Sequence, residues 1–249
     1  PPHGEATVPL ALAVPPTGRC FLRIEATLTR ARGCLPAGFL LGYDEAAASG
    51  ERRYEGAPYT APTSGGPITA SEDDKYLVVR NSAFCYVYNK HTALFDEMTV
   101  GGRALITRPI EYNLYRAPMG IDRPNGSAWW RAGYGRAIPR AYDTTLTYDG
   151  EDAVITSTLS LAPISLQRIM DITAVWRVTP AGVVTVTLDA RKNPDYYSSL
   201  PRFGLRLFLP HAMREVEYCG RGPYENYFDK YHSCYHGTFR ARVEDLYVD

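Results

Sequence analysis

The stretch GRGPYENYFD, residues 220–229, combines two glycines and a proline with tyrosines, an amide and carboxylates. It follows a run of alternating apolar and polar residues, so we expect it to form a loop at the edge of a sheet. Such a loop either forms a hydrogen-bonded corner, in which Glu225 and Asn226 cap backbone donors, or lines a polar pocket. The residues expected to build it are Gly222, Pro223, Glu225, Asn226, Tyr227 and Asp229.

Alternation of apolar and polar residues extends outward from this stretch through much of the chain. A period of two with one apolar face predicts antiparallel strands packed on one side, and therefore an all-β protein. Residues 89–92 and 101–102 are typical of hairpin turns. Strands are expected at 22–28, 75–80, 83–89, 94–100, 141–149, 153–161, 166–179, 184–188 and 203–209, with short helical turns at 127–135 and 223–229.

Composition divides the chain into two parts. Residues 48–74 are rich in Gly, Pro, Ser and Thr and show little alternation, which predicts an interdomain linker. Residues 1–47 have room for three or four strands, too few for an independent β-sandwich. We therefore expect 1–47 to be part of a truncated domain, packed on the larger domain of residues 75–249 or on a second copy.

Charge and cysteine usage restrict the class of partner. The 249 residues carry a formal net charge of zero, which argues against nucleic acid and gives no signal for an anionic membrane. No apolar run is long enough to span a membrane, and the first ten residues lack the features of a signal peptide. Five cysteines without a CxxC pair predict reduced thiols rather than a metal site, and hence a cytoplasmic protein.

Two further motifs carry a family resemblance. Residues 113–118 read NLYRAP and residues 130–144 read WRAGYGRAIPRAYDT. With GRGPYENYFD and the final VEDLYVD, they resemble the small-chain, or fifth, domain of glycoside hydrolase family 2 β-galactosidases, over residues 75–249. Residues 1–47 resemble the back half of the fourth domain. The resemblance implies a galactose-mutarotase-like β-supersandwich, C-terminally truncated, preceded by a partial immunoglobulin-like β-sandwich.

The same resemblance implies a function for the parent protein. Members hydrolyse terminal β-D-galactosides such as lactose with retention, and both catalytic glutamates lie in a preceding TIM barrel that this strand-rich chain does not contain. No residue here is therefore expected to be catalytic. The partners implied are the β-galactoside substrate, the protein's own barrel and further copies in a homo-oligomer. No cofactor is expected here, although the barrel of the parent could hold a divalent and a monovalent cation.

The segment MGIDRPNGSAWW, residues 119–130, is the candidate for contact with substrate. In the family the loop after RAP lies at the mouth of the galactose site, so Gly120, Asp122, Arg123 and Asn125 are the expected substrate-proximal residues, with Arg116 and Pro118 as structural motif residues. Gly120 and Gly126 are the expected flexible points. The family's TDND is replaced by MGID, with only Asp122 kept, which leaves the sugar preference open. The alternative is a solvent loop pinned by Trp129 and Trp130 in the core.

Three other readings of the residues stay open. Glu225 and Asp229 could converge as a carboxylate pair, but backbone capping is the more ordinary role for Glu225. His232 and His236 fall on one strand face, as an aldose epimerase-like enzyme would need if a glutamate faced them across a closed pocket. A non-catalytic carbohydrate-binding or assembly module is the remaining alternative.

Overall fold

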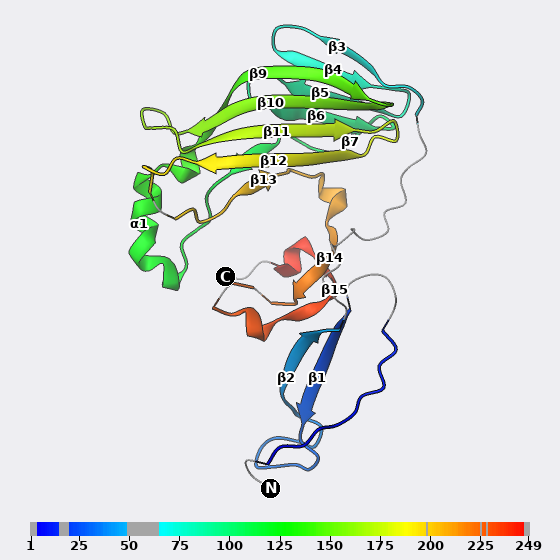
Figure 1. The fold of residues 1–249 in the computed structure, drawn as a ribbon, viewed down its shortest axis with the longest axis vertical. Coiled ribbons are helices and arrows are strands. Elements are labelled where there is room, and N and C mark those ends of the chain that lie inside the picture. Colours follow the sequence, from blue (N-terminus) through cyan, green and yellow to red (C-terminus); the bar gives the residue numbers. More distant parts are fainter. Residues whose placement is uncertain are drawn as a thin grey trace. The chain divides into compact units, whose positions relative to one another are not determined.

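The computed structural model of the chain describes residues 4–14, 20–48, 65–197, 199–224, 226–227 and 229–246. The chain divides into two compact units, Thr60–Arg214 and the combination of Pro1–Tyr59 with Glu215–Asp249. Each unit is built mainly of antiparallel strands (Figure 1), so the predicted all-β class is confirmed. The predicted boundaries at residues 47 and 74 stay predictions.

The unit Thr60–Arg214 contains two antiparallel sheets. A five-stranded sheet runs in the order β3 (Thr69–Glu72), β4 (Tyr76–Arg80), β5 (Phe84–Asn89), β6 (Leu94–Val100) and β7 (Arg103–Ala104). A four-stranded sheet runs in the order β12 (Val184–Lys192), β11 (Met170–Val178), β10 (Asp152–Ala162) and β9 (Ile138–Asp149). A short third pair joins β8 (Glu111–Asn113) to β13 (Gly204–Arg206).

Aromatic and aliphatic side chains between the two larger sheets form the core of this unit. Phe95 of β6 lies edge-on against Trp176 of β11, with ring centroids 5.2 Å apart, a favourable arrangement for aromatic pairs. The Tyr88 hydroxyl lies 2.9 Å from Ser157 Oγ, so its burial leaves no polar group unpaired. Alternate residues of β10 and β11 are buried, as the period of two predicts. The two sheets therefore pack face to face as a sandwich.

One α-helix connects the two sheets of this unit (Figure 1). The chain leaves β8 and forms the 3-10 turn η1 (Gly120–Asp122), helix α1 (Arg123–Arg131) and the 3-10 turn η2 (Tyr134–Arg136) before it enters β9. The predicted helical turn at 127–135 is thus only partly correct. The helix begins earlier because Pro124, in its first turn, has a backbone that suits a helix start.

The second unit is built from two hairpins. The first pairs β1 (Phe21–Thr27) with β2 (Leu40–Ala47), and the second pairs β14 (Glu215–Gly222) with β15 (Tyr235–Arg242). The rings of Phe21 and His236 stack at 3.8 Å, and the Arg23 guanidinium lies 3.8 Å from the centroid of the Tyr235 ring. The N-terminal strands therefore pack within one unit against the hairpin that carries the GRGPYENYFD stretch. Short 3-10 turns lie at η3 (His211–Met213, in the other unit), η4 (Tyr231–Ser233) and η5 (Val243–Leu246).

Several strand and loop predictions need correction. The strand expected at 203–209 is only β13, three residues long, because its partner β8 is equally short and Pro201 and Pro210 lack the N–H that would extend it. Strand β11 begins at Met170 rather than 166, after a turn in which Ser165 has a φ of 65°. The predicted linker 48–74 lies mostly outside the described residues, and its end forms β3.

The edge-loop prediction for 220–229 is also partly wrong. Residues 220–222 belong to strand β14, so the loop starts at Pro223. The described residues between 223 and 229 contain no helical turn, and the nearest one is η4.

Candidate functional site

The segment after NLYRAP is closed by an ion pair between Arg116 and Asp122. Two bonds join them: Arg116 Nη1 lies 2.5 Å from Asp122 Oδ2, and Nη2 lies 3.0 Å from Oδ1. The backbone N–H of Met119 donates to the same carboxylate at 2.9 Å. The Arg116 guanidinium also lies 5.3 Å from the centroid of the Trp129 ring. The four residues together hold the turn in one conformation.

The electrostatics of this pair keep Asp122 ionised. Hydrogen bonds from the Arg116 guanidinium, and then from the Met119 N–H, lower the pKa of Asp122 and outweigh the opposing effect of burial. Both carboxylate oxygens are engaged, and the residue is only 7% exposed. Asp122 therefore anchors the turn, while its predicted proximity to substrate stays a prediction.

The residues around this anchor are exposed to solvent. Gly120, Arg123 and Asn125 are exposed, as is Ile121. Of the predicted substrate-proximal residues, Gly120, Arg123 and Asn125 are the ones that a ligand could reach without breaking the ion pair.

Two expectations for this segment are wrong. Residues 119–130 do not form an open loop, because η1 and α1 occupy most of them. Gly126 lies inside α1, where an added Cβ would come within 3.1 Å of Pro118, so packing rather than flexibility explains this glycine. Trp129 is buried and donates through Nε1 to Ser199 Oγ at 3.1 Å, but Trp130 is 67% exposed and pins nothing in the core.

The corner after β14 depends on Gly222. An added Cβ there would lie 2.6 Å from the Tyr218 hydroxyl and 2.8 Å from the Phe239 ring, so only glycine fits without a shift. The peptide bond between Gly222 and Pro223 is cis. The thiol of Cys234 donates to the Tyr224 carbonyl at 3.3 Å.

The polar residues of this corner do not all have the predicted role. Asn226 and Asp229 are exposed, and the Tyr227 carbonyl accepts a bond from the Lys230 N–H at 2.9 Å. Glu225 lies outside the described residues, so its capping role stays a prediction.

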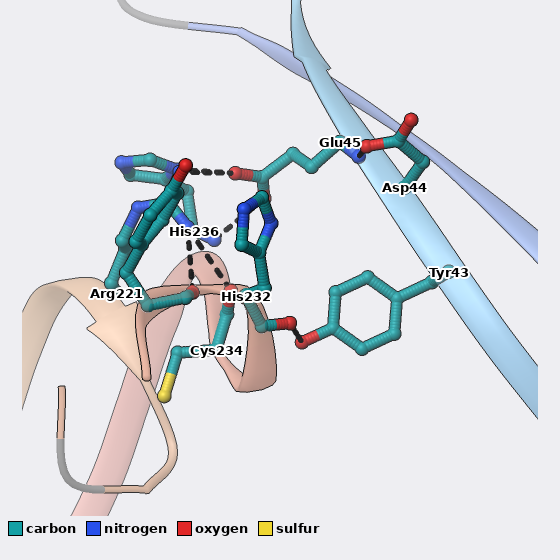
Figure 2. Close-up of polar contacts among 8 residues, drawn as sticks. Tyr43, Asp44, Glu45, Arg221, His232, Cys234 and His236 are labelled. Atoms are coloured by element: carbon teal, nitrogen blue, oxygen red, sulfur yellow. Dashed lines mark hydrogen bonds and ion pairs between the residues drawn. The ribbon is translucent and has the colours of Figure 1, made fainter. Parts of the chain in front are cut away.

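A second cluster of charged side chains was not predicted. Figure 2 shows Glu45 of β2 directed toward His236 of β15, with Arg221 of β14 beside them. Glu45 Oε1 lies 2.5 Å from His236 Nδ1, and Oε2 accepts the His236 backbone N–H at 2.6 Å. Arg221 Nη2 lies 3.7 Å from Glu45 Oε1. The carboxylate thus joins both hairpins of this unit.

The environment of Glu45 favours its charged form. Burial of the carboxylate, whose side chain is 6% exposed, opposes ionisation. The hydrogen bonds from the His236 ring and backbone outweigh burial, so the pKa of Glu45 lies below its ordinary value. Glu45 and His236 are 191 residues apart, so no local motif could reveal the pair.

This geometry argues against the aldose epimerase reading. An acid and a base that act on a sugar must face each other across its ring, whereas Glu45 and His236 are hydrogen-bonded directly to each other. His232 does not join them: its carbonyl accepts a bond from the Tyr43 hydroxyl at 3.1 Å (Figure 2). The His232 ring packs on the ring of Tyr231. The two histidines therefore do not form one site.

The described residues contain neither a candidate metal site nor a helix that could span a membrane. Within the ranges that the structure describes, no three His, Cys, Asp or Glu side chains converge in a way that could hold a metal ion. The five cysteines all lie in the described residues, and none of them is in a disulfide bond. In the same part of the chain, no helix is long and apolar enough to cross a membrane.

A family model and three relatives that match this chain all carry the name β-galactosidase. The model of the family described as β-galactosidase small chain matches residues 80–249. A β-galactosidase from Actinobacillus pleuropneumoniae is 29% identical over 248 residues, which cover 100% of this chain and 24% of the relative. One from Staphylococcus xylosus is 27% identical over 179 residues, covering 72% of this chain and 18% of the relative. A third, from Pseudoalteromonas haloplanktis, is 24% identical over 204 residues, which cover 76% of this chain and 19% of the relative.

The chain spans about a quarter or less of the length of these relatives. The family match itself extends over more than half of the chain and includes the anchored turn, the four-stranded sheet β9–β12 and the corner after β14. The chain therefore belongs to the β-galactosidase small-chain family.

Proposed function

We propose that this chain is the C-terminal part of a β-galactosidase that hydrolyses terminal β-D-galactosides with retention. In that enzyme the chain supplies scaffold and one wall of the active site, and a preceding barrel supplies both catalytic glutamates. Membership of the β-galactosidase small-chain family supports the reaction class.

The turn closed by Arg116 and Asp122 is the observation that supports a role for this chain as one wall of the active site. Retaining hydrolysis needs one carboxylate free to attack the sugar and one protonated carboxyl group to donate to the leaving oxygen. Asp122 fits neither role, because hydrogen bonds occupy both of its oxygens and hold it ionised. The turn instead presents Gly120, Arg123 and Asn125 on a fixed base, which suits positioning rather than chemistry.

The proposal is tested by comparing this chain with the protein encoded by the complete reading frame. We expect the longer protein to release nitrophenol from p-nitrophenyl β-D-galactoside, and NMR of the first product to show the β-anomer. The 249-residue chain, purified free of other glycosidases, is expected to release none. Turnover by the chain alone, or an α-anomer as first product, would contradict the proposal.

A further inference from the structure

A pocket of about 440 Å³ lies in the unit Thr60–Arg214, where three segments meet. These are the C-terminal end of α1, the turn between β10 and β11, and the loop after β12. Its volume is within the range of about 300–1,000 Å³ that is typical of small-molecule sites. The lining residues are Arg131, Leu166, Gln167, Asp195, Tyr196 and Tyr197.

The end of the helix is fixed against the turn between β10 and β11. Gly133 follows α1 with a φ of 71°, and an added Cβ there would lie 2.7 Å from Pro163. Leu166 packs on the same glycine, 3.4 Å from that position. Because this approach requires glycine, the distance between the helix and the turn is set by the backbone.

Hydrogen bonds fix the loop after β12. The Asn193 side chain accepts the Asp195 N–H at 3.0 Å and donates to the Arg168 carbonyl at 3.1 Å. The Tyr134 hydroxyl donates to the Tyr197 carbonyl at 3.1 Å, and the Lys192 ammonium donates to the Tyr196 carbonyl at 3.1 Å. The pocket is therefore preorganised, and a ligand would pay little to order its walls.

Some polar groups of the pocket already make hydrogen bonds within the protein, and others are available to bind a ligand. The Tyr196 hydroxyl donates to the Ala132 carbonyl and so serves the structure. Among the described residues, by contrast, no hydrogen bond or ion pair engages the side chains of Arg131, Gln167 or Asp195. These three offer a guanidinium donor, an amide that both donates and accepts, and a carboxylate acceptor.

An aromatic ring stands beside these polar groups. Tyr197 is 44% exposed and packs edge-on against buried Tyr196, with centroids 5.5 Å apart and planes at 76°. The buried ring thus holds the exposed one in place, and Leu166, 46% exposed, adds apolar surface. An accessible, fixed aromatic side chain offers an apolar surface against which the C–H face of a sugar can pack.

The combination identifies the class of ligand. The positive charge of Arg131 and the negative charge of Asp195 cancel, so the pocket has no net attraction for a phosphate or for a cation. Neighbouring hydroxyls of a sugar need donors and acceptors side by side, which the three available groups provide. We propose that this pocket binds the terminal hexose of a neutral saccharide. This assigns sugar binding to the chain itself, independently of any hydrolysis.

Binding is tested by titrating the 249-residue chain with methyl β-D-galactoside and with lactose, followed by NMR and calorimetry. We expect saturable binding that Tyr197→Ala weakens by about tenfold or more, the loss of one aromatic contact. Asp195→Asn and Gln167→Ala are expected to weaken it as well, whereas Tyr197→Phe, which keeps the ring, should retain most of it. Tyr148→Ala and Asp143→Asn change exposed residues of β9 and serve as matched controls.

Three results would overturn the proposal. They are no saturable binding of either sugar by the folded chain, binding that Tyr197→Ala and Asp195→Asn leave unchanged, and tighter binding of galactose 6-phosphate than of galactose. Because the assay measures binding to the chain alone, its outcome is separate from whether the longer protein hydrolyses galactosides.

Discussion

Glu45 and Asp122 are both held ionised by hydrogen bonds, and neither carboxylate has an oxygen left for chemistry. Each pKa is lower in the folded chain than its ordinary value, 4.5 for Glu45 and 3.8 for Asp122. A carboxyl group with a depressed folded pKa stabilises the fold above its unfolded pKa, and that contribution is lost as the pH falls through the folded pKa. Both residues therefore make the chain sensitive to acid.

Replacing Glu45 tests the cluster between the two hairpins. Glu45→Gln removes the charge that accepts both His236 bonds, so we expect the free energy of unfolding to fall by about 1–3 kcal/mol at neutral pH. We also expect the stability of the variant to depend less on pH below about 4.5, the ordinary value that Glu45 would regain on unfolding. Urea unfolding at several pH values measures both effects.

Asp44→Asn is the matched control for this prediction. Asp44 is exposed on the same strand, and an amide oxygen can still accept the Glu45 N–H that Asp44 Oδ1 accepts at 2.8 Å. Equal losses of stability in the two variants would show that the Glu45–His236 contact contributes nothing particular.

At the scale of an element, strand β14 depends on a glycine that is hemmed in by aromatic rings. Gly222→Ala would place a Cβ 2.6 Å from the Tyr218 hydroxyl and 2.8 Å from the Phe239 ring, so strand or rings must move. We expect a loss of about 1–3 kcal/mol in the free energy of unfolding, as for other overpacked sites. Gly220→Ala, on the same strand with nothing within 4 Å of its Cβ, should change stability little. A reversed order in chemical unfolding would refute this account of the corner.

The elements that the sequence predicted well are those with one buried face. β4, β5 and β10 lie within one residue of the expected ranges at each end, because alternation reports directly on a face packed against a core. β13 was overestimated because alternation says nothing about the length of the partner strand, and β8 is only three residues long. α1 begins earlier than the sequence predicts because MGIDRPNGSAWW has two glycines and a proline that also suit a loop.

The contacts of the candidate site were less predictable than its elements. The motif NLYRAP and the single aspartate kept from TDND marked Arg116 and Asp122, but not that they bind each other. The Glu45–His236 pair joins hairpins from opposite ends of the chain, and the pocket at Tyr197 is assembled from three separate segments. Such contacts depend on tertiary packing, for which a single sequence carries no periodic signal.

At the scale of the whole molecule, the two units differ in the size of their cores. The buried hydrophobic cluster lies entirely within Thr60–Arg214, whereas the described residues of the other unit include a single buried hydrophobic residue, Cys234. We therefore expect residues 60–214 alone to unfold cooperatively in urea, with a near-ultraviolet signal from packed Trp176. A broad, non-cooperative transition without that signal would show that the large unit depends on the other one.

In the proposed function, this chain positions substrate in a β-galactosidase without performing the chemistry. The most direct test is kcat/KM of the complete protein carrying Asp122→Ala, with Asp143→Ala, an exposed carboxylate of β9, as control. Loss of the ion pair that closes the turn should lower kcat/KM roughly 10- to 100-fold. Measurable turnover and a β-anomeric first product should remain, because the substitution does not change the catalytic pair. Asp122→Ala activity equal to that of the wild type, or activity abolished in a protein that is still folded, would contradict the claim.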